Sequence, residues 1–278
     1  MKSKLMLTTL CLVGVLMAVP LWAAEEESHA DLAKKLQNPV ADLISIPFQD
    51  NINFGYGPNN NTQNILNIQP VIPFHITKDW NMITRTIIPL IWQPWPEKKF
   101  GMGDIQESLF FSPAKMVELG GGKFTWGVGP ILNLPTATSD AVGSSKFGAG
   151  PTAVGVYMNG PWVLGGLINN IWASVGGSDD PNINQMLIQP FVNYNLPHAW
   201  YLTFSPVITA NWKADKSGDI WTVPLGAGFG KLFRIGKLPP MNIQVSGYYN
   251  VAKPEIGPDW QLRLQFAVVL PTSLFKGK

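Results

Sequence analysis

The sequence predicts an all-β protein, a 12-stranded antiparallel transmembrane β-barrel preceded by a short helical segment. Three observations predict this fold. Apolar and polar residues alternate over stretches longer than ordinary globular strands, which run to about 5–6 residues. Charged residues make up 14% of the 278 residues, against about 25% in typical soluble domains, while tryptophan occurs 11 times. After the first residues, no apolar run approaches the roughly 20 residues that a membrane-spanning helix needs.

The first 24 residues have the pattern of a secretory signal peptide. Two lysines and an apolar run over residues 5–19 are followed by small residues up to Ala24. Cleavage there removes Cys11, the one cysteine, so the mature chain has no thiol for a disulfide or a metal site. It also removes two of the 20 Lys and Arg residues, which leaves 20 − 2 = 18 against 18 Asp and Glu residues. This balance does not point to nucleic acid.

Residues 25–50 form a separate N-terminal segment, and we place the barrel at 51–278. Within the segment, Leu32, Leu36 and Val40 recur at helical spacing. Two placements stay open. The segment either forms a short surface helix, or it enters the lumen or caps the periplasmic mouth of the barrel.

Strand periodicity is clearest from Trp200 to Trp212. Apolar residues fall on one face of these 13 residues and mostly polar residues fall on the other, as a pleated strand requires. The same alternation runs from Trp260 to Leu270. Such lengths fit the roughly 9–11 residues of a tilted membrane-spanning strand. Tryptophans at both strand ends fit the aromatic belts of the two headgroup interfaces.

The connections between the predicted strands alternate between long polar loops and tight turns. The Asn159–Gly160 pair is a strong signal for a two-residue hairpin, because both turn positions need positive φ. An even strand count with long loops on one side is typical of Gram-negative outer-membrane barrels and puts both termini in the periplasm. The predicted strands cover residues 51–57, 63–74, 80–92, 103–112, 124–134, 148–158, 162–174, 183–194, 200–212, 219–230, 241–251 and 259–270.

A secreted soluble β-protein would also show alternation. It would not normally combine strands this long with so few charges and with paired terminal tryptophans. Prolines inside four predicted strands disturb the pattern, since proline removes a donor from the hydrogen-bond ladder. We therefore expect β-bulges at Pro70, Pro190, Pro206 and Pro224.

Several stretches of the mature chain carry a family resemblance. They read DLAKKLQNPVADLISIPFQDN, LNIQPVIPF, DWNMITRTIIPLI, GMGDIQESLFFSP, GVGPILNLPTATSD, GAGPTAVG, IWTVP and KPEIGPDWQLR. Together they resemble a bacterial family of outer-membrane transporters. The family is often labelled meta-pathway phenol-degradation-like, is sometimes mislabelled neuromedin U, and is related to channels for hydrophobic compounds. The resemblance covers nearly the whole mature chain and implies transport of small hydrophobic or aromatic compounds.

Charged side chains inside the strands are expected to face the lumen. A cation that faces lipid near the midplane of such a barrel costs about 2–4 kcal/mol, so Arg85 and Arg263 should point inward. Asp104 and Gln106 share the inward face, whereas Glu107 alternates onto the other face. Two possibilities stay open for Glu107: a bulge at Gly103 turns it inward, or it approaches a membrane interface. We hypothesise a luminal network of Arg85, Arg263 and Asp104, with Glu107 as a further member. The network either fills the barrel by charge pairing or forms a constriction that sets selectivity.

Amide side chains complete the predicted lining, with Gln69, Gln185 and Gln189 as candidate pore residues. Catalytic residues are scarce. A barrel lipase needs a Ser–His pair at its outer rim, but His75 and His198 fall in periplasmic turns. No metal-ligand spacing occurs, so the sequence predicts no enzyme, no cofactor and no bound metal.

The predicted function is an outer-membrane channel for passive uptake of small molecules. Its partners would be the lipid bilayer, the solute and the outer-membrane assembly machinery, which reads a terminal aromatic residue such as Phe275. A structural or partner-binding barrel without an open pore remains the alternative.

Overall fold

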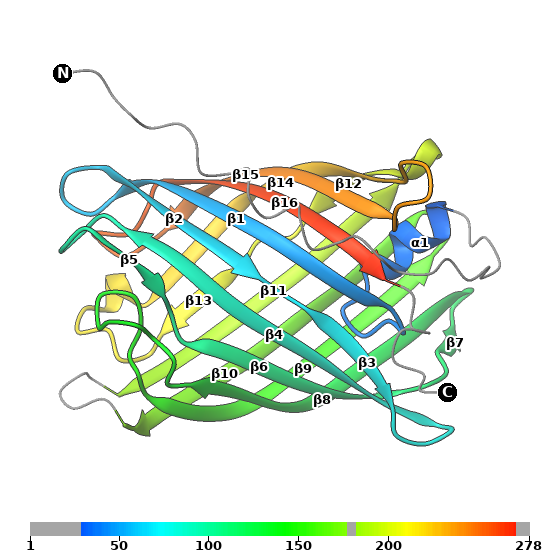
Figure 1. The fold of residues 1–278 in the computed structure, drawn as a ribbon, viewed down its shortest axis with the longest axis horizontal. Coiled ribbons are helices and arrows are strands. Elements are labelled where there is room, and N and C mark those ends of the chain that lie inside the picture. The colour runs from blue at the N-terminus through cyan, green and yellow to red at the C-terminus, as the bar shows by residue number, and fades with distance from the viewer. Residues whose placement is uncertain (1–28, 177–181, 271–278) are drawn as a thin grey trace.

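The computed structural model describes residues 29–176 and 182–270 (Figure 1). The predicted signal peptide at 1–24 and the tail with Phe275 lie outside the described residues. One helix, α1 (His29–Leu36), precedes a closed antiparallel barrel of 12 strands, three of which are interrupted and therefore carry two labels. The predicted fold class and strand number are confirmed.

Short elements join or extend the barrel strands. β7 (Val117–Leu119) extends the hairpin with β8, and the 3₁₀ turns η1 (Pro197–Ala199) and η2 (Ser217–Asp219) lie in connections. The barrel strands are β1 Ile44–Tyr56, β2 Asn61–Ile68 with β3 Val71–His75, β4 Trp80–Gln93, β5 Lys99–Met102 with β6 Ile105–Pro113, β8 Gly122–Leu134, β9 Phe147–Asn159, β10 Trp162–Val175, β11 Ile183–Asn195, β12 Trp200–Phe204 with β13 Ile208–Asn211, β14 Trp221–Phe233, β15 Met241–Ala252 and β16 Trp260–Leu270.

The first and last strands close the barrel. β1 runs antiparallel to β16 from Ile44 opposite Leu270 to Phe54 opposite Trp260. On the far side of the ring, β10 pairs with both β9 and β11. Closure is a physical requirement in lipid, because an open sheet edge would leave backbone N–H and C=O groups without partners.

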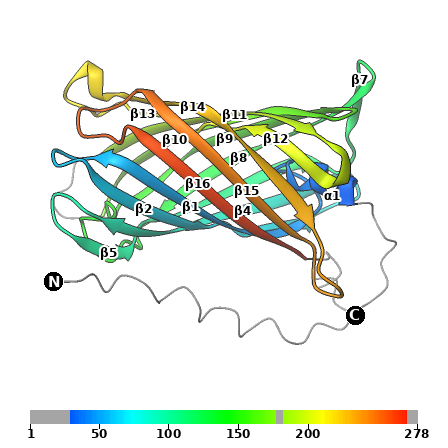
Figure 2. The same cartoon turned by 90° about the horizontal axis from the view of Figure 1, so that it is seen from above.

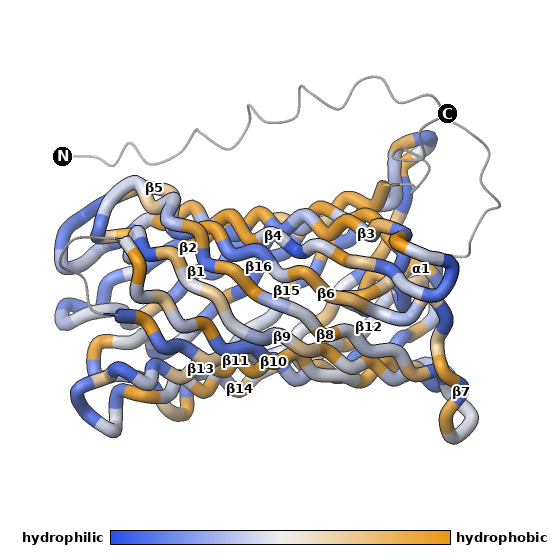
Figure 3. The backbone as a smooth tube through the Cα atoms, turned by 90° about the horizontal axis from the view of Figure 1, so that it is seen from below, coloured by the Kyte–Doolittle hydropathy of each residue, from blue (hydrophilic) through white to orange (hydrophobic). Residues whose placement is uncertain are grey.

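Side chains alternate between the lumen and the lipid along the long strands, and Figure 3 shows the resulting alternation of hydrophobic and hydrophilic residues. In β10, Val163 and Leu167 are buried inside the barrel, whereas Trp162 and Trp172 are exposed on the outer surface. A strand places successive side chains on opposite faces, so a single pattern satisfies both the lumen and the bilayer.

Tryptophan marks both ends of the outer surface. Trp80 and Trp92 lie near the two ends of β4 and are 41% and 43% exposed. The Trp80 ring meets that of Trp126 with centroids 5.8 Å apart, and Trp212 meets Trp221 at 5.5 Å. Two belts of amphipathic rings fit the two headgroup regions of a bilayer. Among the described residues, no helix is long and apolar enough to cross a membrane.

The two ends of the barrel differ in their connections. Two residues join β9 to β10, and η1 joins β11 to β12, whereas residues 135–146 form a long loop between β8 and β9 at the opposite end. Short turns face the periplasm in outer-membrane barrels. Figures 1 and 2 both show α1 at the short-turn end, which is therefore the periplasmic end.

The hairpin predicted at Asn159–Gly160 is shifted by one residue. Asn159 pairs with Trp162, so the turn residues are Gly160 and Pro161, and Gly160 has φ +53°. A type I′ turn needs positive φ at both central positions, but proline fixes φ near about −65°. The chain therefore uses a turn with glycine at the first central position, as in type II′.

The four prolines at which we expected bulges coincide with irregular pairing. Pro70 lies in the gap between β2 and β3, and Pro206 lies in the gap between β12 and β13. A register shift of β14 against β15 falls at Pro224. Pro190 lies within β11, at the point where the partner strand is interrupted over residues 205–207. Proline lacks the N–H that a ladder hydrogen bond needs at these places, whereas Pro130 and Pro151 lie opposite each other in a ladder without a register shift.

Several predicted strand boundaries differ from the observed ones, most of all the start of the first strand. β1 begins at Ile44 rather than at 51, and its first residues pair with the end of β16. The alternation from Ile44 onward therefore belongs to the barrel and not to the N-terminal segment. β14 begins at Trp221 rather than at 219, because residues 217–219 form η2.

Candidate luminal site

The inward faces of the strands give the lumen a polar lining. Many of these polar groups hydrogen-bond to one another: Asn53 Nδ2 donates to Gln63 Oε1 at 2.9 Å, and Gln63 Nε2 donates to Gln93 Oε1 at 2.6 Å. Most buried polar groups in proteins are paired in this way. The buried polar side chains of the lining include Asn51, Asn53, Gln69, Ser108, Asn133, Thr152, Asn169, Asn193, Thr203, Asn242 and Ser246.

Residues 29–43, which we call the leader, pack inside the barrel at the periplasmic end of this lumen. Gln37 and Asn195 exchange two side-chain hydrogen bonds of 3.0 and 3.2 Å. Leu32 and Ala33 of α1 are buried in one apolar cluster with Ala199, Leu232 and Val269. These contacts place the leader against the inner barrel wall, so the surface-helix alternative does not describe it.

The leader also contributes to a second apolar cluster inside the barrel. Val40 packs there with residues that come from five different strands. Gly127 leaves the space that the Val40 side chain occupies, since a Cβ atom on Gly127 would lie 3.0 Å from Val40 Cγ1. The cluster fills the lumen beside the leader with side chains. Its buried members are Val40, Ile83, Phe110, Val154, Val156, Val163, Leu167 and Phe191.

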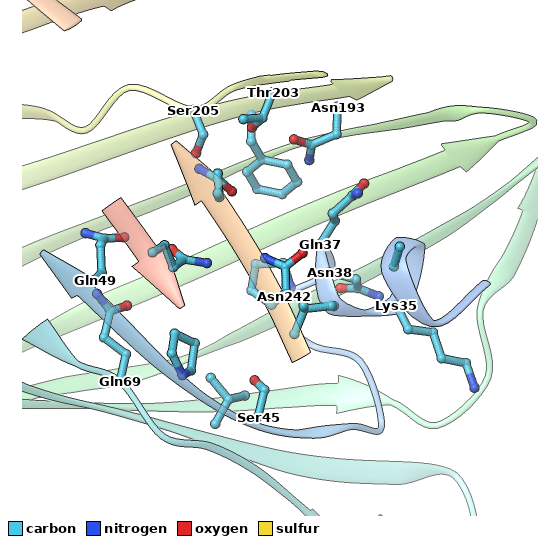
Figure 4. A pocket seen from close by; sticks show the side chains of 18 of the residues that line it. Lys35, Gln37, Asn38, Ser45, Gln49, Gln69, Asn193, Thr203, Ser205 and Asn242 are labelled. Atoms are coloured by element: carbon cyan, nitrogen blue, oxygen red, sulfur yellow. The ribbon is translucent and has the colours of Figure 1, made fainter. Parts of the chain in front are cut away.

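A cavity of about 160 Å³ lies between the leader and the barrel wall. Figure 4 shows side chains of the leader, such as Gln37 and Asn38, and of the barrel, such as Gln69 and Ser205, around the same space. Polar residues make up much of the lining. The adjoining part is apolar and includes Val71, Leu167 and Phe191.

Arg85 lines this cavity from β4. Its Nη2 donates to Gln69 Oε1 at 2.9 Å, and Gln69 itself is 6% exposed. Arg85 pairs with Val71 in one ladder and with Ser108 in the other, so it points inward together with these residues. Arg85 as a whole residue is partly buried, and it lines the cavity.

Arg263 lines the same cavity and is held more tightly. Its Nε donates to Asn51 Oδ1 at 3.1 Å, Nη1 to the Ser205 carbonyl at 2.9 Å and Nη2 to Gln261 Oε1 at 3.1 Å. The guanidinium also lies 4.8 Å from the Tyr248 ring centroid, within the range of a cation–π contact. Ser205 lies in the gap between β12 and β13, so Arg263 satisfies a carbonyl that the ladder leaves free.

Asp104 does not join the two arginines, and this part of the predicted network is wrong. Its carboxylate accepts hydrogen bonds from the backbone N–H groups of Thr136, Ala137, Ser144 and Ser145, and from the Ser144 hydroxyl. Asp104 thereby fixes the loop 135–146 at the outer mouth. Residues 140–144 of this loop line a second cavity, of about 380 Å³, together with Gln63, Gln93 and Ile183.

Glu107 faces outward, so its predicted role in the lumen is also wrong. It pairs with Thr86 in the ladder and accepts a hydrogen bond of 2.5 Å from the Thr86 hydroxyl. The neighbouring Ser108 faces inward with Arg85, and no register shift separates the two residues. The pairing with β4 does shift by one residue at Gly103 and Asp104, between β5 and β6, but this irregularity does not turn Glu107 inward.

The remaining predicted residues lie at the first cavity or nearer the outer end of the barrel. Gln189 lines the first cavity and donates to Ser205 Oγ at 2.9 Å. Gln106 lies opposite Asn133, and exposed Gln185 lies opposite Asn211, nearer the outer end. The sequence interpretation did not single out Gln37 and Asn38 of the leader, because nothing local predicts that the leader folds into the barrel.

Histidines and possible metal ligands are sparse in the described part of the chain. The three histidines lie in α1, at the end of β3 and in η1, all at the periplasmic end. His75 lies 3.1 Å from an Asp42 carboxylate oxygen. Within residues 29–176 and 182–270, no group of three or more His, Cys, Asp or Glu side chains could hold a metal ion.

No protein-family profile and no curated protein matches this sequence. Solved structures do match. An outer membrane channel from Pseudomonas putida F1 superposes with a TM-score of 0.60 at 15% identity, over 82% of this chain and 95% of that one. This chain is an outer-membrane β-barrel. The likeness shows the barrel fold alone, since the sequence identity is low.

Two further structural neighbours are more distant. Outer membrane phospholipase A from Escherichia coli has a TM-score of 0.45 at 13% identity, over 88% of this chain and 99% of the other. A FadL homologue from Pseudomonas aeruginosa has a TM-score of 0.34 at 8% identity, over 82% and 88% of the two chains. Neither similarity is strong enough to support an argument about activity.

Proposed function

We propose that this outer-membrane barrel is a channel for passive uptake of small molecules. The observation that carries the proposal is a polar lumen with a cavity that the leader and the barrel wall line together. Residues 29–43 take no part in the sheet, so the leader can move without breaking a ladder hydrogen bond. The resemblance to phenol-degradation-like transporters adds small hydrophobic or aromatic compounds as solutes. Insertion by the outer-membrane assembly machinery belongs to the same proposal.

One observation favours a different function. The apolar cluster around Val40 fills the lumen beside the leader with side chains. If the leader never leaves this position, the protein is a structural or partner-binding barrel without an open pore. Movement of the leader therefore distinguishes the two functions.

A cross-link between the leader and the barrel tests the channel directly. Ala33 and Ala199 belong to one buried cluster, and the mature chain is expected to contain no natural cysteine. We expect the double variant Ala33→Cys, Ala199→Cys to lose conductance in planar bilayers when the thiols are joined by a disulfide or a short cross-linker. Reduction of the disulfide should restore the conductance.

The single variants serve as controls and should conduct like the wild-type protein under both conditions. Equal conductance of the linked and reduced double variants would rule out gating by the leader. Absence of conductance in every form, wild type included, would favour the structural barrel.

Solute preference is tested by liposome swelling with a phenyl glycoside and a disaccharide of similar size. Faster swelling with the phenyl glycoside is expected for a channel that takes aromatic solutes. Equal rates would mean a general pore, and swelling with neither solute would contradict the channel.

A further inference from the structure

The cavity beside the leader is lined by two arginines, Arg85 and Arg263, and by no aspartate or glutamate. The positive charge of Arg263 repels that of Arg85. Within the described part of the chain, neither arginine forms a salt bridge. Buried charge without a counter-charge is costly, so an arrangement of this kind favours an anion in the cavity.

In this cavity, the polar groups of Arg85 and Asn38 that are open to a ligand are hydrogen-bond donors. In the part of the chain that the structure describes, Arg85 makes one side-chain hydrogen bond, which leaves its Nε and Nη1 groups for another acceptor. Asn38 is 4% exposed, and its Oδ1 accepts from the Val40 N–H at 3.0 Å. Its buried Nδ2 has no hydrogen-bond partner among the described residues. A ligand that fits must therefore bring acceptor atoms.

The apolar part of the lining selects among anions. Val71 lies directly opposite Arg85 in the ladder, and Leu167 and Phe191 line the same space. The cavity volume of about 160 Å³ is close to that of an engineered protein cavity of about 150 Å³ that binds benzene. A compact inorganic anion would satisfy the charge but would leave this apolar surface without contacts.

We infer that the cavity binds a small organic carboxylate with an apolar body of about the size of a benzene ring. The carboxylate lies on Arg85, where the planar guanidinium can donate two parallel hydrogen bonds. The apolar body lies against Leu167 and Phe191. The inference rests on the proposed channel, since the ligand would be a solute in transit, and it narrows the solute class from aromatic compounds to their carboxylates.

The test is calorimetric titration of the purified full-length barrel in detergent with benzoate, benzyl alcohol and inorganic phosphate. Benzoate should bind at least tenfold more tightly than either of the other two, because each lacks one of the two features that the cavity recognises. Arg85→Gln should weaken benzoate binding at least tenfold, which corresponds to about 1.4 kcal/mol. Arg85→Lys keeps the positive charge but lacks the planar pair of donor groups. Its affinity for benzoate should therefore lie between those of the wild-type protein and Arg85→Gln.

Arg234→Gln is the matched control, because Arg234 lies in a periplasmic turn and donates to the Leu238 carbonyl. Its affinity for benzoate should equal that of the wild-type protein. Heat-modifiable migration in electrophoresis establishes that each variant is folded. Unchanged benzoate binding in folded Arg85→Gln, or phosphate binding as tight as benzoate, would overturn the inference.

The outcomes separate the ligand site from the proposed channel. Binding of benzoate without conductance or flux would retain the site and contradict the channel. Flux without benzoate binding would retain the channel and contradict the site.

Discussion

At the scale of single residues, the least expected feature is a carboxylate on the lipid-facing surface. Glu107 accepts its hydrogen bond from Thr86, which lies six residues from both Trp80 and Trp92 and therefore midway between the two aromatic belts. A charge there is unfavourable, although carboxylates cost less than the roughly 2–4 kcal/mol of a lysine or arginine. We expect Glu107→Gln to raise the free energy of unfolding by about 1 kcal/mol, measured by urea unfolding in lipid vesicles.

Glu97→Gln serves as the control for Glu107→Gln, because Glu97 is an exposed residue of an outer loop. Its free energy of unfolding should stay within about 0.5 kcal/mol of the wild-type value. A loss of stability in Glu107→Gln would mean that the charged hydrogen bond to Thr86 outweighs the cost of placing the carboxylate in lipid.

The sequence predicts well where a side chain lies when one energetic cost decides between the lumen and the lipid. Arg85 and Arg263 lie in the lumen, where the cost of a cation in lipid places them. The same rule fails for Glu107, because a hydroxyl on the neighbouring strand offsets part of that cost. The unpaired Nδ2 of Asn38 could not be predicted, because it depends on how the leader packs against strands far away in the sequence.

At the scale of elements, the gap between β12 and β13 depends on side chains from other strands. The Ser205 carbonyl in this gap accepts hydrogen bonds from Arg263 Nη1 and, at 3.2 Å, from the Tyr248 hydroxyl. Tyr248→Phe removes one of these two donors. We expect it to lower the free energy of unfolding by about 1 kcal/mol in the same vesicle assay.

Tyr249→Phe is the matched control, since Tyr249 is the next residue of β15 and is 44% exposed on the outer surface. Its stability should be close to that of the wild-type protein. Equal losses in both variants would show that the gap does not depend on the Tyr248 hydroxyl.

Element types were predictable because proline, glycine and strand alternation act locally. Pro206 signals an irregularity, and the gap lies there. The sequence does not reveal which donors satisfy that gap, because Tyr248 and Arg263 come from β15 and β16. The hairpin shift at Gly160 shows the limit of a dipeptide signal, since the following proline decides which turn forms.

At the scale of the whole molecule, the bilayer explains why the fold can be predicted from the sequence. Every strand must present an apolar outer face and reach both headgroup regions, so length, alternation and tryptophan position all carry the same information. No comparable rule governs the leader. Its position depends on contacts such as those of Gln37 with Asn195, which are far apart in the sequence, and both placements therefore stay open until the structure is known.

The electrostatics of the whole lumen lead to a further prediction. With Arg85 and Arg263 lining the cavity and no carboxylate beside them, the proposed channel should pass anions in preference to cations. Mobile salt screens this preference, because the Debye length falls from about 10 Å at 0.1 M to about 3 Å at 1 M. Reversal potentials in potassium chloride gradients should therefore show anion selectivity that is strongest at low salt.

Arg85→Ala should reduce this selectivity by removing one of the two arginine charges, whereas Arg234→Gln, in a periplasmic turn, should leave it unchanged. Arg263 would still supply part of the field in Arg85→Ala, so some anion preference should persist. If selectivity and conductance are the same in Arg85→Ala and in the wild-type protein, Arg85 fills space in the barrel and does not set what passes through it.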